Sequence, residues 1–157
     1  MSQRHPIIAI TGSSGAGTTT VKDTFSKIFV REGVNAAFIE GDAFHRYDRA
    51  AMKQKVAEEE KNGNLHFTHF NPEANELETL EGVFENYGRT GTGKTRIYVH
   101  DDGEAELYGT PPGTFTPWRD LPDSDVLFYE GLHGCAVTEK VNLAKHVDLK
   151  IGVVPVI

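Results

Sequence analysis

The sequence predicts an α/β fold with a mostly parallel central sheet, and three stretches carry this prediction. Residues 7–11 form a short apolar run, residues 12–20 are rich in glycine and threonine, and residues 36–40 form a second apolar run. A stretch of helical periodicity separates the two apolar runs. The order strand, loop, helix, strand is typical of a parallel β-α-β unit, so we expect helices to pack against a layer of strands.

The first elements follow directly from the positions of the apolar residues. A buried strand over 7–11 leads into a helix that Gly33 ends, and a second strand covers 36–40. The apolar side chains of the helix recur at helical spacing: Val21, Phe25, Ile28 and Phe29.

Two further helices are predicted in the middle of the chain. Asp48 can cap a helix that runs to about Lys61, and Asn71-Pro72 can open another. Residues 65–70 between them look irregular. The apolar face of the second helix contains Leu77, Leu80, Val83, Phe84 and Tyr87.

The second half of the chain begins with a predicted β-hairpin. Residues 96–100 and 105–108 are its strands, Asp101-Asp102-Gly103-Glu104 is its turn, and a proline- and glycine-rich excursion follows over 110–118. The remaining elements are a buried strand over 126–129, a short helix over 141–145 and a last strand over 147–154.

Composition places the chain among soluble proteins of one domain. The 157 residues are 38% hydrophobic and 25% charged, and they show no internal repeat. We expect a single domain over residues 1–157 that is truncated at its C-terminal end, because the last residues are apolar and typical of a core strand. A net charge of −7 without a basic stripe argues against nucleic-acid and membrane binding.

The compartment follows from what the sequence lacks. Cys135 is the single cysteine and cannot form an internal disulfide. No apolar run has the length of a membrane span, and the first residues do not resemble a signal peptide. We therefore expect a cytoplasmic protein.

The glycine-rich stretch predicts a phosphate-binding loop. Gly12 and Gly17 have the spacing of the G-x-x-x-x-G-K-[ST] pattern, but Thr18 stands at the lysine position and Thr19 follows it. The missing positive charge must come from elsewhere. The residues predicted to bind nucleotide are Gly12, Ser13, Ser14, Gly15, Ala16, Gly17, Thr18, Thr19 and Thr20.

A second glycine-rich stretch, residues 88–95, satisfies the complete pattern and includes Lys94. It follows a predicted helix and leads into a predicted strand, so no helix N-terminus would face a phosphate there. We interpret it as a flexible loop.

Acidic residues follow two of the predicted strands. In a phosphoryl-transfer site, Thr19 and Glu130 can hold Mg²⁺, although helix capping and a solvated strand exit explain the same residues. Asp42 lies just beyond the strand over 36–40, where ligands bind in open α/β sheets. Its carboxylate can accept a proton from a substrate hydroxyl that attacks the γ-phosphate.

Cations lie close to this acid. Arg49 and Lys53 are four residues apart on one helix face, with His45 and Arg46 just before the helix. This arrangement suits a sugar phosphate, but a solvated basic face balanced by residues 58–60 fits the pattern as well. Lys53 could also replace the missing loop lysine.

Two other patterns indicate structure rather than chemistry. His66 and His69 have H-x-x-H spacing, but no third ligand is nearby and a polar turn explains them better than a zinc site. Cys135 follows His133 by two residues, yet a lone cysteine near a core strand is typical of packing.

Four motifs resemble the proteobacterial type of phosphoribulokinase, a family related to uridine and pantothenate kinases. The motifs are residues 12–22 without the loop lysine, 40–46, 94–100 and 128–133. The resemblance covers essentially the whole chain. It implies a three-layer fold like that of the P-loop nucleotide kinases, with the hairpin as an excursion from a mostly parallel sheet.

The resemblance also implies an activity and roles for individual residues. The activity is the ATP- and Mg²⁺-dependent phosphorylation of ribulose 5-phosphate at its 1-hydroxyl, which gives ribulose 1,5-bisphosphate for CO₂ fixation in the Calvin cycle. Asp42 would be the catalytic base and Glu130 would act on the Mg²⁺-nucleotide. The residues that would face the sugar phosphate are His45, Arg49, Lys53, Tyr98 and His100.

Regulation and assembly are implied in the same way. Arg31 would belong to an allosteric site for NADH at the interface of a homo-oligomer. The family continues past Ile157 with a lysine, a second acidic residue and arginines that complete the active site. Two alternatives stay open: a related kinase for a nucleoside or another hydroxylated metabolite, and a non-catalytic nucleotide-binding or assembly module.

Overall fold

A parallel sheet forms the centre of the computed structural model, which describes residues 5–13 and 15–155. Its strands lie in the order β2-β5-β1-β6, and every neighbouring pair is parallel. The strands are β1 (Ile7–Gly12), β2 (Ala36–Glu40), β5 (Val126–Gly131) and β6 (Leu149–Val153). Glu130 pairs with both Ile10 and Glu40, so β1, β2 and β5 end at one edge of the sheet. The predicted α/β fold with a mostly parallel sheet is confirmed.

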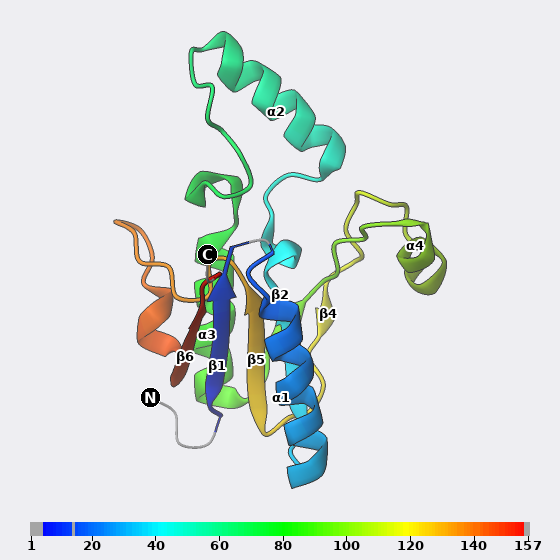
Figure 1. Ribbon diagram of the computed structural model, residues 1–157, viewed down its shortest axis with the longest axis vertical. Helices are drawn as coiled ribbons and strands as arrows, with labels where there is room; N and C mark the ends of the chain where they lie inside the picture. The colour runs from blue at the N-terminus through cyan, green and yellow to red at the C-terminus, as the bar shows by residue number, and fades with distance from the viewer. Residues whose placement is uncertain (1–4, 14, 156–157) are drawn as a thin grey trace.

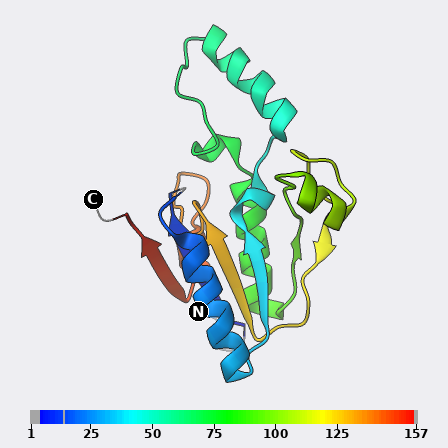
Figure 2. The same ribbon diagram turned by 45° about the vertical axis from the view of Figure 1, so that its right-hand side comes forward.

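Helices cover both faces of the sheet (Figures 1 and 2). Helix α1 (Thr18–Glu32) packs on one face and α3 (Leu77–Thr90) on the other. Successive side chains of β5 point to opposite faces, so Phe128 contacts α1 whereas Leu127 and Tyr129 pack with α3. On the α3 side the buried helix residues are Leu77, Leu80, Phe84 and Tyr87, as predicted. The fold therefore has three layers.

Helix α2 (Arg49–Lys61) extends beyond the carboxyl edge of the sheet (Figure 1). Asp48 caps it as predicted, because its Oδ1 accepts a hydrogen bond from the Ala51 N–H at 2.8 Å. A small cluster of Met52, Phe67 and Ala74 holds the helix against the irregular segment that comes after it.

The start of α3 differs from the prediction. Asn71-Pro72 opens a short 3-10 helix, η2 (Pro72–Ala74), and α3 begins only at Leu77. Asn75 lies between them in an extended conformation, and its side chain donates to the carbonyls of His69 and Asn71, both at 2.9 Å. These local hydrogen bonds compete with a continuous helix.

The predicted hairpin between 96–100 and 105–108 is wrong. Residues 102–108 form a helix, α4 (Asp102–Tyr108), because Asp101 caps it and accepts from the Glu104 N–H at 2.9 Å. The antiparallel partner of the first stretch lies further along the chain. Tyr98 forms a bridge with Phe115, and the pair β3 (Lys94–Thr95) and β4 (Arg119–Asp120) is antiparallel.

Short elements complete the chain. A 3-10 helix, η1 (Gly41–Phe44), comes directly after β2, and η3 (Leu143–His146) lies where a helix over 141–145 is predicted. The second glycine-rich stretch, residues 88–95, runs from the end of α3 through residues 91–93 into β3, so the order of helix, loop and strand is as predicted.

Candidate active site

The loop after β1 has the conformation of a phosphate cradle. Gly15 and Gly17 have φ angles of +79° and +97°, which residues other than glycine rarely adopt. Gly17 is the N-cap of α1, and no side chain in the described part of the chain caps this helix. Its first N–H groups can therefore bind an anion, assisted by the helix dipole. Ser14, one of the predicted loop residues, lies outside the described residues.

A cavity of about 540 Å³, here called the edge cavity, lies over the carboxyl ends of β1, β2 and β5. It brings together most of the residues that the sequence analysis selects. Those that line it are Gly12, Ser13, Gly15, Thr18, Thr19, Asp42, His45, His100 and Glu130. Residues of the loop, of η1 and of the segment before α4 thus face one space.

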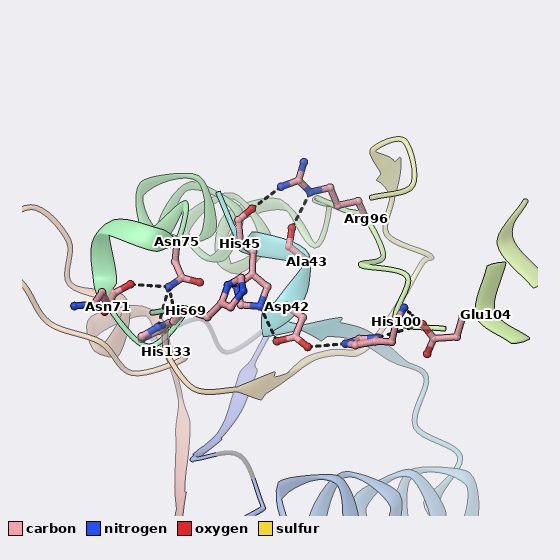
Figure 3. A network of polar contacts seen from close by, with 10 residues as sticks. All are labelled: Asp42, Ala43, His45, His69, Asn71, Asn75, Arg96, His100, Glu104 and His133. Carbon is pink, nitrogen blue, oxygen red and sulfur yellow. Dashed lines mark hydrogen bonds and ion pairs between the residues drawn. The ribbon is translucent and has the colours of Figure 1, made fainter. Parts of the chain in front are cut away.

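Asp42 lies on η1 between two histidines (Figure 3). Its Oδ1 is 3.0 Å from Nε2 of His45, and its Oδ2 is 2.9 Å from Nε2 of His100. The hydrogen bond from His45, joined by that from His100, outweighs burial and lowers the pKa of Asp42 to about 2. Asp42 is therefore ionised at neutral pH and accepts from both rings.

A second layer of polar groups stands behind His45. His69 Nδ1 is 3.2 Å from His45 Nδ1, and Asn75 Nδ2 is 3.1 Å from Nε2 of His133 (Figure 3). Burial lowers the pKa values of His69 and His133, so both rings are neutral at pH 7. When His45 is neutral and donates from Nε2 to Asp42, its Nδ1 accepts a hydrogen bond from His69.

Arg96, from the segment between β3 and α4, holds η1 in place. Its Nε donates to the Ala43 carbonyl at 2.7 Å, and its Nη2 donates to the His45 carbonyl at 3.0 Å. The guanidinium lies over the rings of Phe115 and Trp118, with Cζ 3.7 and 4.6 Å from their centroids. The backbone directly after Asp42 is thus fixed at two carbonyls by one side chain.

Two glycines bring the ends of β2 and β5 into close contact. A Cβ on Gly41 would lie 2.5 Å from the hydroxyl oxygen of Tyr129 and 3.1 Å from Cα of Gly131. Tyr129 is fully buried beneath them, and burial raises the pKa of its hydroxyl above the usual range. This packing helps to fix the positions of Asp42 and Glu130 at the carboxyl ends of the two strands.

Lys22 supplies positive charge to the edge cavity. It lies one helical turn after Thr18, and its Nζ is 3.0 Å from Oε1 of Glu40. Burial lowers the pKa of Lys22, but the charges of Glu40 and Glu130 outweigh burial and the pKa is raised. Among the described residues that line the cavity, it is the only lysine or arginine.

Three oxygen-bearing side chains that line the edge cavity are of a chemical type that binds Mg²⁺. Thr19, Glu40 and Glu130 present a hydroxyl and two carboxylates to the edge cavity. In phosphoryl-transfer sites Mg²⁺ takes one or two protein oxygen ligands and completes its shell with water and phosphate. The side chains present are therefore of the kind that this ion uses.

Three predicted sugar-phosphate residues do not line the edge cavity as described. Arg49 Nη2 donates to the His100 carbonyl at 2.8 Å, and the Tyr98 ring contacts the rings of His45 and His100. Lys53 is exposed on α2. Their roles stay predictions, and so does that of Arg31, which lies exposed in the last turn of α1 with its Nε 2.7 Å from Oε1 of Glu32.

Several residues of the site are not predicted from the sequence. Lys22 could have been found, because a lysine four residues after Thr18 shares its face of the helix. The H-x-x-H spacing of His69 favours a polar turn over a zinc site and does not indicate a place beside His45. Asn75 and Arg96 carry no sequence signal for this site, because their contacts with His133 and η1 join distant segments. The contact of Glu104 with His100 is local, but it depends on α4, which the sequence analysis does not predict.

A phosphate cradle at a helix N-terminus, with carboxylates at the same edge of a three-layer parallel sheet, defines a P-loop protein of the kinase type. The comparisons with known proteins agree and go further. The model of the Phosphoribulokinase / Uridine kinase family matches residues 7–157, and the chain belongs to this family.

Individual relatives support the assignment. The chain is 69% identical to a phosphoribulokinase of Sinorhizobium medicae (strain WSM419) and 61% identical to phosphoribulokinase 1 of Cereibacter sphaeroides, and both alignments cover 100% of this chain and 54% of the relative. The chain spans about half the length of the curated relatives it matches.

Solved structures give the same picture. A phosphoribulokinase from Rhodobacter spheroides superimposes with a TM-score of 0.88 at 56% identity, covering 99% of this chain and 53% of that one. A possible uridine kinase from Bacillus stearothermophilus has a TM-score of 0.67 at 17% identity, over 97% of this chain and 72% of that one, which shows the fold alone.

Membrane insertion has no support in the helices. Across residues 5–13 and 15–155, none of the helices combines the length and the apolar character that a bilayer crossing requires.

Proposed function

We propose that this chain carries the phosphate loop and the catalytic base of a kinase that transfers the γ-phosphoryl group of ATP to ribulose 5-phosphate, giving ribulose 1,5-bisphosphate. The observation that carries the proposal is the position of Asp42. It faces the same cavity as the phosphate loop and is held between His45 and His100. The phosphoribulokinases that the chain matches support the choice of substrate.

Each step assigned to this chain uses a group at the edge of the sheet. The loop N–H groups and the start of α1 bind the nucleotide phosphates. Thr19 and Glu130 would hold Mg²⁺, which neutralises charge on the phosphates when it is bound. Asp42 accepts the proton of the 1-hydroxyl as the hydroxyl oxygen attacks the γ-phosphorus, and the bond from this phosphorus to the β–γ bridging oxygen breaks to release ADP.

The low pKa of Asp42 bears on this proton transfer. A carboxylate that accepts from two imidazoles is a weak base, because both hydrogen bonds favour its ionised form. The substrate hydroxyl would take the place of one histidine at Asp42. Losing that hydrogen bond raises the pKa of Asp42 at the moment when the hydroxyl is in contact with it.

The recognition of the sugar phosphate is proposed for His45, Arg49, Lys53, Tyr98 and His100. Tyr98 and Arg49 contact the segment that carries His100, which supports a shared role. A place for Arg31 in an NADH-responsive site of a homo-oligomer rests on the family resemblance and on its exposure. One sheet with two helical layers also supports a single domain.

The test compares Asp42→Asn with the wild-type complete protein, using ATP, Mg²⁺ and ribulose 5-phosphate. We expect kcat to fall by about 10²- to 10⁴-fold while the affinity for ATP stays within a factor of two, because a general base acts in the transition state. Asp102→Asn, an exposed carboxylate on α4, is the matched control and should behave as wild type.

The outcomes separate the alternatives. Wild-type turnover of uridine but not of ribulose 5-phosphate would identify a nucleoside kinase. Binding of Mg²⁺-ATP without turnover of either would indicate a non-catalytic module. A mutant Asp42→Asn with near-normal kcat would remove Asp42 from the role of base.

A further inference from the structure

His100 stands between two carboxylates that come from different elements. Its Nε2 is 2.9 Å from Oδ2 of Asp42 on η1, and its Nδ1 is 3.1 Å from Oε2 of Glu104 on α4 (Figure 3). The same Glu104 oxygen accepts the backbone N–H of His100 at 2.7 Å. An oxygen that accepts two N–H groups carries no proton of its own. Both ring nitrogens of His100 are therefore placed to donate, which is the hydrogen-bonding pattern of an imidazolium cation.

Local sequence produces the second of these contacts. Asp101 caps α4 through the Glu104 N–H, which places Glu104 in the first turn with its side chain pointing back over the residue before the cap. In a common capping box the third-position glutamate only satisfies backbone N–H groups. Here it also reaches a ring nitrogen, and that ring lines the edge cavity.

The charges around His100 favour the cation. Asp42 and Glu104 face the ring nitrogens, Tyr98 lies edge-on with ring centroids 5.0 Å apart, and Arg49 approaches the backbone carbonyl rather than the ring. Burial lowers the pKa of His100, but the hydrogen bonds to the two carboxylates outweigh burial and raise it. The ring is still 43% exposed, so a ligand in the cavity can reach it.

We propose that Glu104 is a positioning residue that keeps His100 doubly protonated, so that α4 delivers a positive charge beside Asp42 for the binding of an anionic, phosphorylated sugar. This inference rests on the proposed function. The two carboxylates act differently. Asp42 exchanges its histidine contact for the substrate hydroxyl, whereas Glu104 stays on Nδ1 and preserves the charge after Nε2 is released.

The pH dependence comes directly from this arrangement. A cation with a raised pKa is present below that pKa and is lost as the pH rises through it. The affinity for the sugar phosphate should fall over the same range. Replacing Glu104 by glutamine removes the negative charge but keeps an oxygen for the His100 N–H, so the loss should move to lower pH.

The experiment measures the titration of His100 by ¹⁵N NMR in the complete protein labelled at histidine, with the resonance assigned from a His100→Gln sample. We expect Glu104→Gln to lower the pKa of His100 by about one unit, the lower end of the effect of an adjacent opposite charge. Glu106→Gln removes an exposed carboxylate from the same helix and should leave the pKa unchanged.

Kinetics provide the second readout. At pH 8, Glu104→Gln should raise KM for ribulose 5-phosphate about fivefold with a smaller change in kcat, and the difference should shrink towards pH 6. Glu104→Asp, whose shorter side chain keeps the charge but withdraws it from the ring, should shift the pKa in the same direction by less. It replaces Glu104→Gln in both readouts if the glutamine variant does not fold.

Each result decides a different point. An unchanged pKa of His100 in Glu104→Gln would show that Glu104 serves only as a helix cap and would overturn the proposal. A lowered pKa with an unchanged KM would overturn the link to sugar-phosphate binding. Absence of turnover of ribulose 5-phosphate by the wild type would refute the proposed function, while the NMR titration would still decide whether Glu104 controls His100.

Discussion

Replacing Arg96 by lysine tests whether one side chain fixes the segment that carries Asp42. Arg96 is 13% exposed and donates to the carbonyls of Ala43 and His45 while stacking on Phe115. A lysine keeps the charge but lacks the planar fork that reaches both carbonyls and lies flat on a ring. We expect the variant to lose one charge-assisted hydrogen bond, about 1.5 to 3 kcal/mol, and part of a cation–π contact, about 0.5 to 2 kcal/mol.

The expected loss is therefore about 2 to 5 kcal/mol in the free energy of unfolding, measured by urea unfolding of the complete protein. Because the freed carbonyls belong to residues just after Asp42, kcat should also fall by about tenfold or more under conditions where the variant is folded. Arg89→Lys, on the exposed surface of α3, is the control and should change stability by less than about 0.5 kcal/mol. An Arg96→Lys variant that matches this control in stability and kcat would refute the reasoning.

Two further predictions concern the same edge of the sheet. Gly41→Ala should lower the free energy of unfolding by about 1 to 3 kcal/mol, because its Cβ would lie 2.5 Å from the Tyr129 hydroxyl. Gly82→Ala in α3 has open space and should stabilise the fold by about 0.5 to 1 kcal/mol. Equal effects of the two substitutions in urea unfolding would contradict this prediction. The Asp42 carboxylate, whose pKa is about 2 rather than the ordinary 3.8, should stabilise the fold above about pH 4 and cease to do so as the pH falls towards 2. The stability difference between wild type and Asp42→Asn should therefore shrink in acid, and a constant difference between pH 6 and pH 2.5 would rule out the low pKa.

The central sheet could be predicted because its strands are continuous apolar runs. In a parallel sheet covered on both faces, Leu127, Phe128 and Tyr129 are all buried whichever way they point, so the run itself identifies the strand. The hairpin prediction failed because residues 105–108 alternate like a strand, while the decisive signal was the cap. Asp101 at the N-cap, with Asp102 and Glu104 in the first turn, favours a helix.

One rule predicts which residues of the site lie together. Parallel strands end at one edge, so Asp42 and Glu130 had to lie near the loop after β1. What the rule does not give is the orientation of each group. Arg96 acts on η1 through two carbonyls, and Glu104 acts on Asp42 through the ring of His100. The Arg96–Ala43 and His100–Asp42 contacts join segments more than 50 residues apart. The Glu104–His100 contact depends on α4, whose residues alternate like those of a strand.

The loop without lysine is part of a cavity that is short of positive charge. Among the described residues that line it, Glu40, Asp42 and Glu130 face Lys22 and the His100 imidazolium, so three carboxylates oppose two cations. ATP and a sugar phosphate would add several negative charges. A metal ion and cations from outside this lining would offset them. Helix α2 carries Arg49 and Lys53 beyond the same edge of the sheet, and Arg49 already contacts the backbone of His100. Closing α2 over a bound anion would add charge where the loop lacks it.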